Sequence, residues 1–251
     1  MHTGPGQNFY IQIMILYVNG DSHSAGSELV HIKGRYLIAR ETDDDDWQVI
    51  GESRGRDPHP ECVQRSYGKL LADRIGAKFV CDAVSASSND RILRTTREYL
   101  KHNRPDSIII GWSTWEREEW FHEGTQQWWQ INGGGVGFDW PTEFKERYKQ
   151  YVLKIDHKKS MEIAHTQIWQ LHQELDQLDI PHLFFNTYSW FDKEDHLDWE
   201  GHYFEPYSKQ FTYFEWLRLR GFQRVTPDSY HYGPDAHRAW ADFLYQNYFN
   251  K

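Results

Sequence analysis

Residues 9–26 read FYIQIMILYVNGDSHSAG and change abruptly from apolar to polar near the start of the chain. Residues 9–18 are rich in β-branched and aromatic side chains, and Asn19-Gly20 favours a turn, so the segment predicts a buried strand followed by a turn. Asp21, Ser22 and His23 come next. An acid, a hydroxyl and an imidazole at the end of a strand can form a nucleophile site, a metal-binding pair or a plain polar turn.

Three further short apolar segments predict strands at residues 77–84, 106–111 and 182–186. Segments with helical spacing separate them and close the chain, so the order of elements predicts β-α-β units in a three-layer α/β fold with a mostly parallel central sheet. Ligands of such sheets bind beyond the carboxyl ends of the strands, where Ser22 lies. The helices are expected over residues 60–75, from the cap at Ser88 to Leu100, over 141–178 and over 233–249.

A length of 251 residues favours one domain with insertions. We expect residues 1–8 to be a disordered leader and residues 9–251 to form the single domain. Aromatic residues make up 16% of the chain, with 12 Trp, and they concentrate in two predicted insertions at about residues 112–142 and 187–227. These aromatic residues can form a lid over the site, hinged at residues 133–135, or pack the insertions against the domain.

Composition argues against several partners. The net charge is −9 without a basic stripe, which argues against nucleic acid as a partner. The longest apolar stretch, residues 9–18, is about half the ~20 residues of a membrane span. Cys62 and Cys81 lack C-x-x-C spacing, which argues against a disulfide framework or zinc cluster. The N-terminal segment lacks the pattern of a signal peptide, so we expect a cytoplasmic protein. The acidic run at residues 43–46 fits a solvated loop better than a calcium site. The sequence does not indicate the oligomeric state.

A serine nucleophile needs a base within hydrogen-bond reach. The segment TPDSYHYGPDAH, residues 226–237, offers one just before the terminal helix. Asp228 and His231 stand three residues apart there, so the carboxylate can orient the imidazole from the same loop. His237, on the helix itself, is a rival base.

Gly20-Asp21-Ser22 near one end and Asp228-x-x-His231 near the other resemble the SGNH (GDSL-type) hydrolases. The chain is most similar to phage-encoded members, with which it shares the strings NGDSH, SNDRI and WEREEW. The resemblance implies a flavodoxin-like α/β/α fold and a serine esterase without a cofactor. It makes Ser22 the nucleophile, His231 the general base and Asp228 the acid that orients His231.

The family stabilises the oxyanion with the serine N–H, a glycine N–H after the second strand and an asparagine side chain after the third. In this chain the backbone N–H of Ser22 remains, the glycine position falls on Ala86 or Ser87, and Ser113 replaces the asparagine. Asn89 is an alternative side-chain donor. Because loss of one such donor typically costs about 10²–10³ in rate, the resemblance also allows a catalytically reduced carbohydrate-binding or virion-associated module.

A small-molecule or glycan ester, such as an acylated carbohydrate, is the expected substrate. Trp112 and Trp115 are candidates for stacking on a sugar ring, and Arg117 is a candidate for binding an acidic substrate group.

Asp21-Ser22-His23 also matches the D-x-H start of metallophosphoesterases, and the chain has 14 His. The later metal-binding blocks of that family are missing in this order, so we predict no metal at Ser22. A second candidate metal set, without fixed geometry, comprises Asp192, Asp195, His196 and His202.

Overall fold

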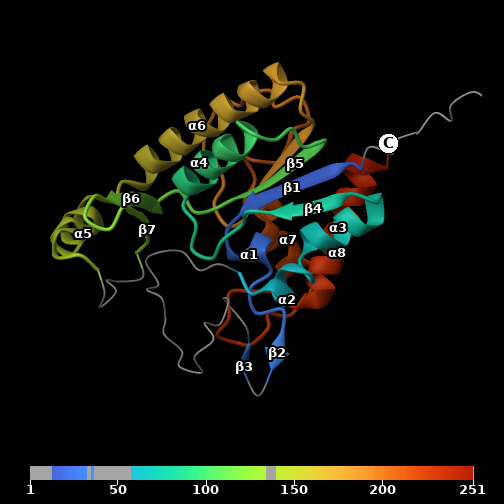
Figure 1. Ribbon diagram of the computed structural model, residues 1–251, viewed down its shortest axis with the longest axis horizontal. Helices are drawn as coiled ribbons and strands as arrows, with labels where there is room; N and C mark the ends of the chain where they lie inside the picture. The colour runs from blue at the N-terminus through green and yellow to red at the C-terminus, as the bar shows by residue number, and fades with distance from the viewer. Residues whose placement is uncertain (1–12, 33–34, 37–57, 134–139, 251) are drawn as a thin grey trace, which may run out of the picture.

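The computed structural model describes residues 13–32, 35–36, 58–133 and 140–250. Its centre is a five-stranded parallel sheet with the strand order β4-β1-β5-β8-β9 (Figure 1). The predicted α/β class with a mostly parallel sheet is therefore confirmed. The strands are β1 (Ile15–Gly20), β4 (Lys78–Cys81), β5 (Ser107–Trp112), β8 (His182–Asn186) and β9 (Tyr203–Phe204).

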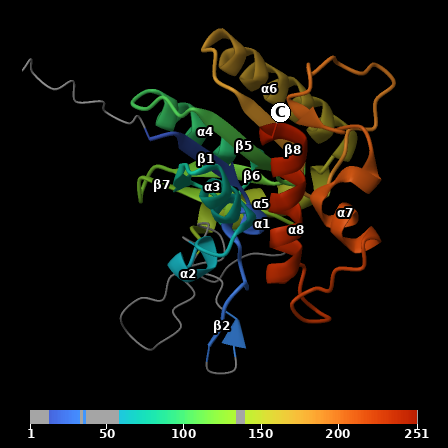
Figure 2. The same ribbon diagram turned by 90° about the vertical axis from the view of Figure 1, so that its right-hand side faces the viewer.

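Alternate side chains of the strands face two layers of helices, because successive residues of a strand point to opposite faces. On one face, Tyr17 and Phe184 pack with α4 (Asn89–Leu100) and α6 (His157–Gln177). On the other, Leu16 packs with residues of three helices, α3 (Tyr67–Ile75), α7 (Tyr213–Leu219) and α8 (Pro234–Leu244). Figure 1 shows α4 and α6 above the sheet, and Figure 2 shows α7 beside α8 on the opposite side.

Two predicted helices are each divided in the structure by a capping residue. The segment 60–75 forms α2 (Pro60–Val63) and α3, because the Ser66 hydroxyl accepts a hydrogen bond from the Lys69 N–H and starts a new helix. The segment 141–178 forms α5 (Thr142–Lys154) and α6, because Asp156 caps α6 through the Lys159 N–H.

The segment 112–142 contains an antiparallel hairpin, β6 (Glu118–His122) and β7 (Gln127–Ile131), which lies with α5 at one end of the molecule (Figure 1). Trp120 and Trp129 are buried between the hairpin and α5, where they contact the Phe144 ring edge to face. These tryptophans therefore pack the segment internally. The remaining short elements are α1 (Ser22–Ala25), β2 (His31–Ile32), β3 (Arg35–Tyr36), a 3₁₀ turn (Lys209–Phe211) and a π-helical turn (Tyr245–Phe249).

Two glycines on neighbouring strands allow α1 to lie directly against the end of the sheet. Gly20 and Gly111 are paired in the β1–β5 register. A Cβ atom at Gly20 would lie 2.3 Å from the Ser24 hydroxyl oxygen, and one at Gly111 would lie 2.7 Å from it. Both positions therefore exclude larger residues, and the short helix that carries Ser22 sits at the carboxyl end of the sheet.

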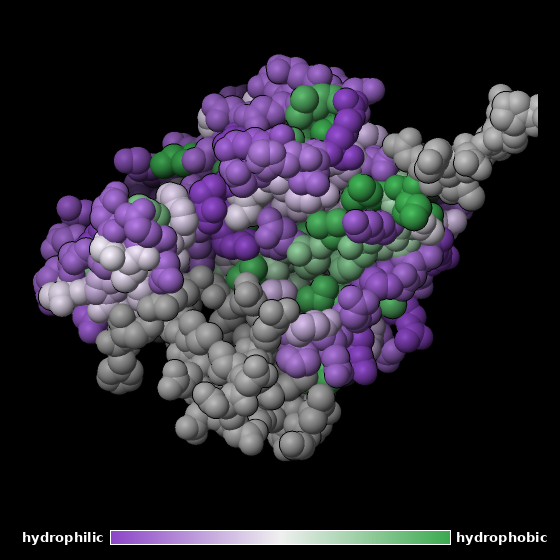
Figure 3. Space-filling view, in the orientation of Figure 1, coloured by the Kyte–Doolittle hydropathy of each residue, from purple (hydrophilic) through white to green (hydrophobic). Residues whose placement is uncertain are grey.

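The face seen in Figure 3 is mainly hydrophilic over α4 and α6, and hydrophobic residues gather over α3 and β4. No helix in the described ranges combines the length and apolar character needed to cross a bilayer. Three predictions fall outside the described residues: the leader at residues 1–8, the acidic loop at 43–46 and most of the proposed glycine hinge, from residue 134 onward.

Candidate active site

Ser22 is the first residue of α1, immediately beyond the carboxyl end of β1. Asp21 caps this helix, since its Oδ1 accepts a hydrogen bond from the His23 N–H at 3.0 Å. Asp21 is completely buried, which raises the pKa of its carboxyl group, while the nearby Arg117 guanidinium acts in the opposite direction. Asp21 therefore holds the turn in which Ser22 is presented.

Three side chains from distant parts of the sequence form a chain of hydrogen bonds. The Ser22 Oγ lies 2.8 Å from Nε2 of His231, and Nδ1 of His231 lies 3.0 Å from Oε2 of Glu28. The Glu28 carboxylate can only accept, so Nδ1 carries the proton and Nε2 presents its lone pair to the serine hydroxyl. The arrangement is that of a serine, a base and an orienting acid.

The acid in this arrangement is Glu28 and not Asp228, which corrects the sequence prediction. Asp228 is exposed, whereas Ser229 is buried. The Ser229 N–H donates to the Thr226 carbonyl and hydroxyl oxygens at 3.1 and 3.2 Å. This turn places the Ser229 side chain inward. The Ser229 hydroxyl then donates to Glu28 and accepts from the His231 N–H at 2.9 Å. Ser229 thus links His231 to Glu28.

Glu28 is suited to remain ionised beside His231. The hydrogen bond from His231 lowers the pKa of the Glu28 carboxyl group, and the bond from Ser229 acts in the same direction against partial burial. Glu28 itself has a left-handed backbone with φ of 65°, in the turn that follows α1. No spacing rule predicts this contact, because Glu28 and His231 are 203 residues apart.

Ser22 and His231 open onto a cavity of about 630 Å³, a size typical of small-molecule sites. Tyr188 and Tyr230 form part of its wall, and the Tyr188 hydroxyl donates to the Tyr230 carbonyl oxygen at 3.0 Å. The cavity therefore offers aromatic surface close to the hydroxyl and imidazole. Its lining consists of Ser22, His23, Ser85, Ala86, Thr114, Arg117, Asn132, Tyr188, Tyr230 and His231.

Ala86 is one of the two residues on which the family's glycine position falls. It lines the cavity and has φ of 65°, a left-handed conformation that is uncommon for residues with a Cβ. The backbone thus keeps the shape that favours glycine, although the residue is alanine. Such strained residues occur preferentially at functional sites.

Ser113 and Asn89, the two predicted side-chain donors, lie behind the cavity wall. The Asn89 Oδ1 accepts from the Ser113 N–H at 2.9 Å, and its Nδ2 donates to the Ser113 carbonyl oxygen at 3.3 Å. The Ser113 hydroxyl donates to Asp21 at 3.4 Å and accepts from Nη1 of Arg117 at 2.8 Å. Neither side chain lines the cavity. Their hydrogen bonds instead fix the backbone after β5 and the Arg117 guanidinium.

Arg117 contributes a positive charge to the cavity lining. Within the described residues, its hydrogen bonds to Ser113 and Ser87 and its ion pair with Asp21 at 3.5 Å all involve Nη1. The guanidinium has further N–H groups, and Arg117 lines the same cavity as Ser22. Arg117 can therefore donate hydrogen bonds to a bound ligand while Nη1 stays anchored. The prediction that Arg117 binds an acidic substrate group stays a prediction.

The two predicted stacking tryptophans are placed elsewhere. Trp112 is fully buried and packs edge to face against Phe184 beneath α6, so it is a core residue. Trp115 stacks on Phe191 with ring centroids 4.7 Å apart and lines a separate, more charged cavity. Neither ring lines the Ser22 cavity. Tyr188 and Tyr230 do line it, but nothing in the sequence distinguishes them from the chain's many other aromatic residues.

His237, the rival base, is buried within the core. Its Nδ1 accepts from the Tyr67 N–H at 3.1 Å, and its Nε2 lies 3.3 Å from the Tyr213 hydroxyl. Burial lowers the pKa of His237 to about 3. It does not line the cavity, so its position favours a structural role.

The His23 ring lies beside the ring of His231. It packs against His231 with centroids 4.8 Å apart and against Tyr188 at 5.0 Å. Burial lowers the pKa of His23 well below its usual value, so the ring is neutral beside His231. In the described residues, neither Asp21 with His23 nor the second candidate set brings three metal-ligating groups together. This arrangement favours the serine over the D-x-H interpretation.

Residues 54–224 match the model of a protein family whose description is "Family of unknown function (DUF6071)". The chain belongs to this family. The part matched by the DUF6071 model includes Ala86, Ser113 and Arg117, whereas Ser22, Glu28 and His231 lie outside it. No curated protein sequence matches this DUF6071 chain.

Several solved structures resemble this DUF6071 chain at a distance. An acetyl xylan esterase from the rumen bacterium Butyrivibrio proteoclasticus has 11% identity and a TM-score of 0.37, over 98% of this chain and 67% of that one. A family 2 carbohydrate esterase from Myceliophthora fergusii has 14% identity and a TM-score of 0.41 over the same shares. A lipolytic protein of the G-D-S-L family from Desulfitobacterium hafniense has 10% identity and a TM-score of 0.28, over 75% of this chain and 93% of that one.

Proposed function

We propose that this chain is a serine esterase that hydrolyses a small acyl ester in the cavity at the carboxyl end of the sheet. The observation that carries the proposal is the continuous hydrogen-bond chain from Ser22 through His231 to Glu28. The Ser22 hydroxyl and the His231 ring both line an open cavity, so a substrate can reach them. This combination of an activated hydroxyl and an accessible cavity supports acyl transfer.

The reaction follows from the atoms present. Ser22 Oγ attacks the ester carbonyl carbon while Nε2 of His231 takes the hydroxyl proton, which gives a tetrahedral intermediate with a negative oxygen. His231 then donates that proton to the departing alcohol, leaving the acyl group on Ser22. Water, deprotonated by His231, releases the acid and regenerates the serine. Glu28 holds the imidazole in position and stabilises its positive charge.

In this proposal Arg117 takes over the oxyanion-stabilising role that the resemblance assigns to a side chain after β5. Ser113 cannot fill that role, because its hydroxyl is engaged with Asp21 and Arg117. The N–H groups of Ser22 and Ala86 are the two backbone donors in the proposed set, and the Arg117 guanidinium is the third. A charged donor compensates for the missing asparagine, which favours an active enzyme over a catalytically reduced binding module.

An acylated carbohydrate is the proposed substrate class. Tyr188 and Tyr230 supply ring surface on which a sugar can stack, and the cavity is large enough for an acylated monosaccharide unit. Acetylated sugars and short-chain nitrophenyl esters are therefore the appropriate assay substrates.

The test compares wild type with Ser22→Ala on nitrophenyl acetate and on acetylated xylose, with Ser208→Ala as a control for the same substitution away from the cavity. We expect Ser22→Ala to abolish turnover and Ser208→Ala to retain it. A fluorophosphonate should modify wild type once, on the peptide that contains Ser22. Equal rates for wild type and Ser22→Ala would refute the nucleophile assignment. Glycan binding without hydrolysis by wild type would favour the binding module instead.

A further inference from the structure

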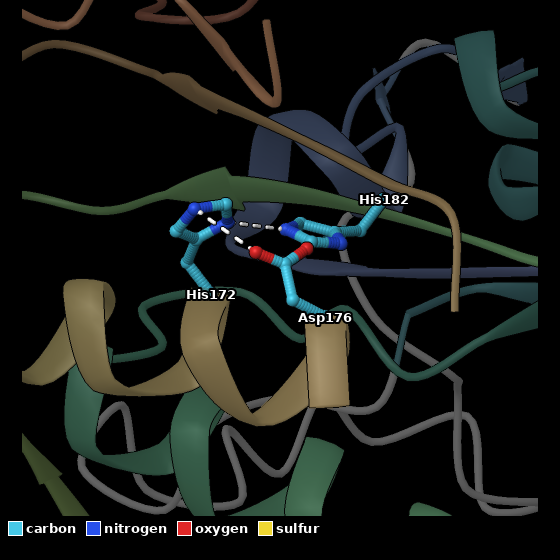
Figure 4. Close-up of side chains that lie close together, drawn as sticks. All are labelled: His172, Asp176 and His182. Atoms are coloured by element: carbon cyan, nitrogen blue, oxygen red, sulfur yellow. Dashed lines mark hydrogen bonds and ion pairs between the residues drawn. The ribbon is translucent and has the colours of Figure 1, made fainter. Parts of the chain in front are cut away.

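Two imidazoles and a carboxylate meet at the end of the sheet opposite to the Ser22 cavity. His172 and Asp176 lie one helical turn apart on α6, and His182 is the first residue of β8 (Figure 4). One ligand atom from each residue lies within 4.8 Å of the other two, and this is the one such group of three in the described residues. The site is thus built from a helix and a neighbouring strand.

The imidazoles are buried and held in fixed orientations. His172 has a side-chain exposure of 2%, and His182 is also buried. Nδ1 of His182 lies 2.9 Å from the Ile180 carbonyl oxygen, so it carries the proton and Nε2 presents a lone pair to the cluster. A metal-binding histidine is commonly oriented in this way by a carbonyl group on its other nitrogen.

The two rings and the carboxylate already face one another across short distances. Nε2 of His182 lies 2.8 Å from Nδ1 of His172, and Nε2 of His172 lies 3.3 Å from Oδ2 of Asp176. The three side chains therefore bring their ligand atoms close enough together to hold one metal ion.

We propose that His172, Asp176 and His182 bind one divalent transition-metal ion, with zinc as the best match. Two imidazole nitrogens and one carboxylate oxygen are a ligand set that zinc prefers, with water in the fourth position. The ion ties α6 to the start of β8. Because the site lies at the amino end of β8 and Ser22 lies beyond the carboxyl end of β1, the ion stabilises the fold and takes no part in ester hydrolysis.

Only a small rearrangement is needed to admit the ion. Ligands in a tetrahedral zinc site are about 3.3 Å apart, so the two facing nitrogens, now 2.8 Å apart, must separate by about half an ångström. Asp176 has a side-chain exposure of 39% and is able to move into the coordination sphere. The exposed carboxylate also gives the ion a path from solvent. The His202 ring stacks on the His182 ring with centroids 4.3 Å apart, and this contact limits how far the His182 ring can move.

The experiment uses the full chain, stripped with a chelator and desalted, and titrates it with Zn²⁺ in competition with a chromophoric chelator. We expect one tight site per chain in wild type. Asp176→Asn should lower the affinity for Zn²⁺ at least tenfold. Asp179→Asn, at an exposed position just after α6, should leave the affinity unchanged. Because Asp176 is exposed, Asp176→Asn should fold. His182→Gln should remove the site, and His196→Gln serves as the matched control.

A spectroscopic measurement locates the ion. Co²⁺ in place of Zn²⁺ should give visible absorption bands of a four-coordinate nitrogen and oxygen site in wild type and in Asp179→Asn, with the bands altered in Asp176→Asn. Zn²⁺ should also raise the thermal unfolding midpoint of wild type but not of His182→Gln. The proposal is overturned if wild type binds less than one equivalent, or if Asp176→Asn and Asp179→Asn bind Zn²⁺ equally. Ester hydrolysis is a separate readout and tests the Ser22 proposal independently.

Discussion

Replacing Glu28 by Gln tests the proposed catalytic arrangement most directly. The substitution keeps an oxygen that can accept from Ser229 but removes the negative charge beside His231. Nδ1 of His231 and Oε2 of Glu28 are 3.0 Å apart, which places the charges of an imidazolium and a carboxylate about 4 Å apart. The Gln amide can also turn its NH₂ group toward Nδ1 and so favour the wrong imidazole tautomer. Both effects oppose proton transfer from Ser22.

The size of the loss follows from the geometry. At an effective dielectric constant of about 20, unit charges about 4 Å apart interact by about 4 kcal/mol, or about 10³ in rate. Glu28 and His231 have side-chain exposures of 19% and 16%, so solvent screens part of this interaction. We therefore expect kcat/KM of Glu28→Gln to fall about 10²–10³-fold.

Asp228→Asn is the matched comparison, since it makes the same change on the loop that carries His231. Its carboxylate is exposed, so kcat/KM should change by less than about twofold. The assay is hydrolysis of nitrophenyl acetate at pH 8, with circular dichroism and the thermal midpoint used to verify folding. A large loss in Asp228→Asn, with Glu28→Gln close to wild type, would refute the assignment of Glu28 as the orienting acid.

Two other predictions concern Arg117 and His237. Arg117→Ala should lower kcat by about 10²–10³ with little change in KM, as expected for loss of an oxyanion donor; a rise in KM alone would mean that Arg117 binds a substrate group. For His237, the buried ring has a pKa of about 3, below the ordinary 6.5 of an unfolded chain. Its contribution to stability is therefore present above pH 6.5 and is lost as pH falls toward 3, by about 2 kcal/mol at pH 5. Urea unfolding at pH 7.5 and pH 5 should show that His237→Gln loses about 2 kcal/mol less stability than wild type over this interval, and equal losses would contradict the prediction.

Local patterns predicted most of the sheet. The apolar run before Asn19-Gly20 and the segment HLFFN produced β1 and β8, because burial of both sheet faces requires continuous apolar strands. The cap at Ser88 likewise began α4 as expected. β9 and α7 were not predicted, since both lie in the aromatic segment 187–227, where helical and strand periodicities are not distinct.

The candidate site also contains residues that the sequence predicted and one that it did not. The sequence placed Ser22 after a strand and His231 before the last helix, and the two side chains do meet. It could not identify Glu28, because the direction of a side chain in a turn depends on the hydrogen bonds of that turn. Thr226 and Ser229 form the turn in which Asp228 is exposed, while the Ser229 hydroxyl donates to Glu28.

The sequence by itself therefore determined the α/β class and the end of the sheet where the polar cluster lies, because both follow from hydrophobic periodicity and the order of elements. The pairing of Ser22 with His231 was predicted from the motifs at the two ends of the chain and their family resemblance. Only the tertiary structure decided which acid contacts His231, that Trp112 is buried and Arg117 lines the cavity, and that His172 and His182 meet. Those outcomes depend on burial and on contacts between residues far apart in the chain, which no local pattern encodes.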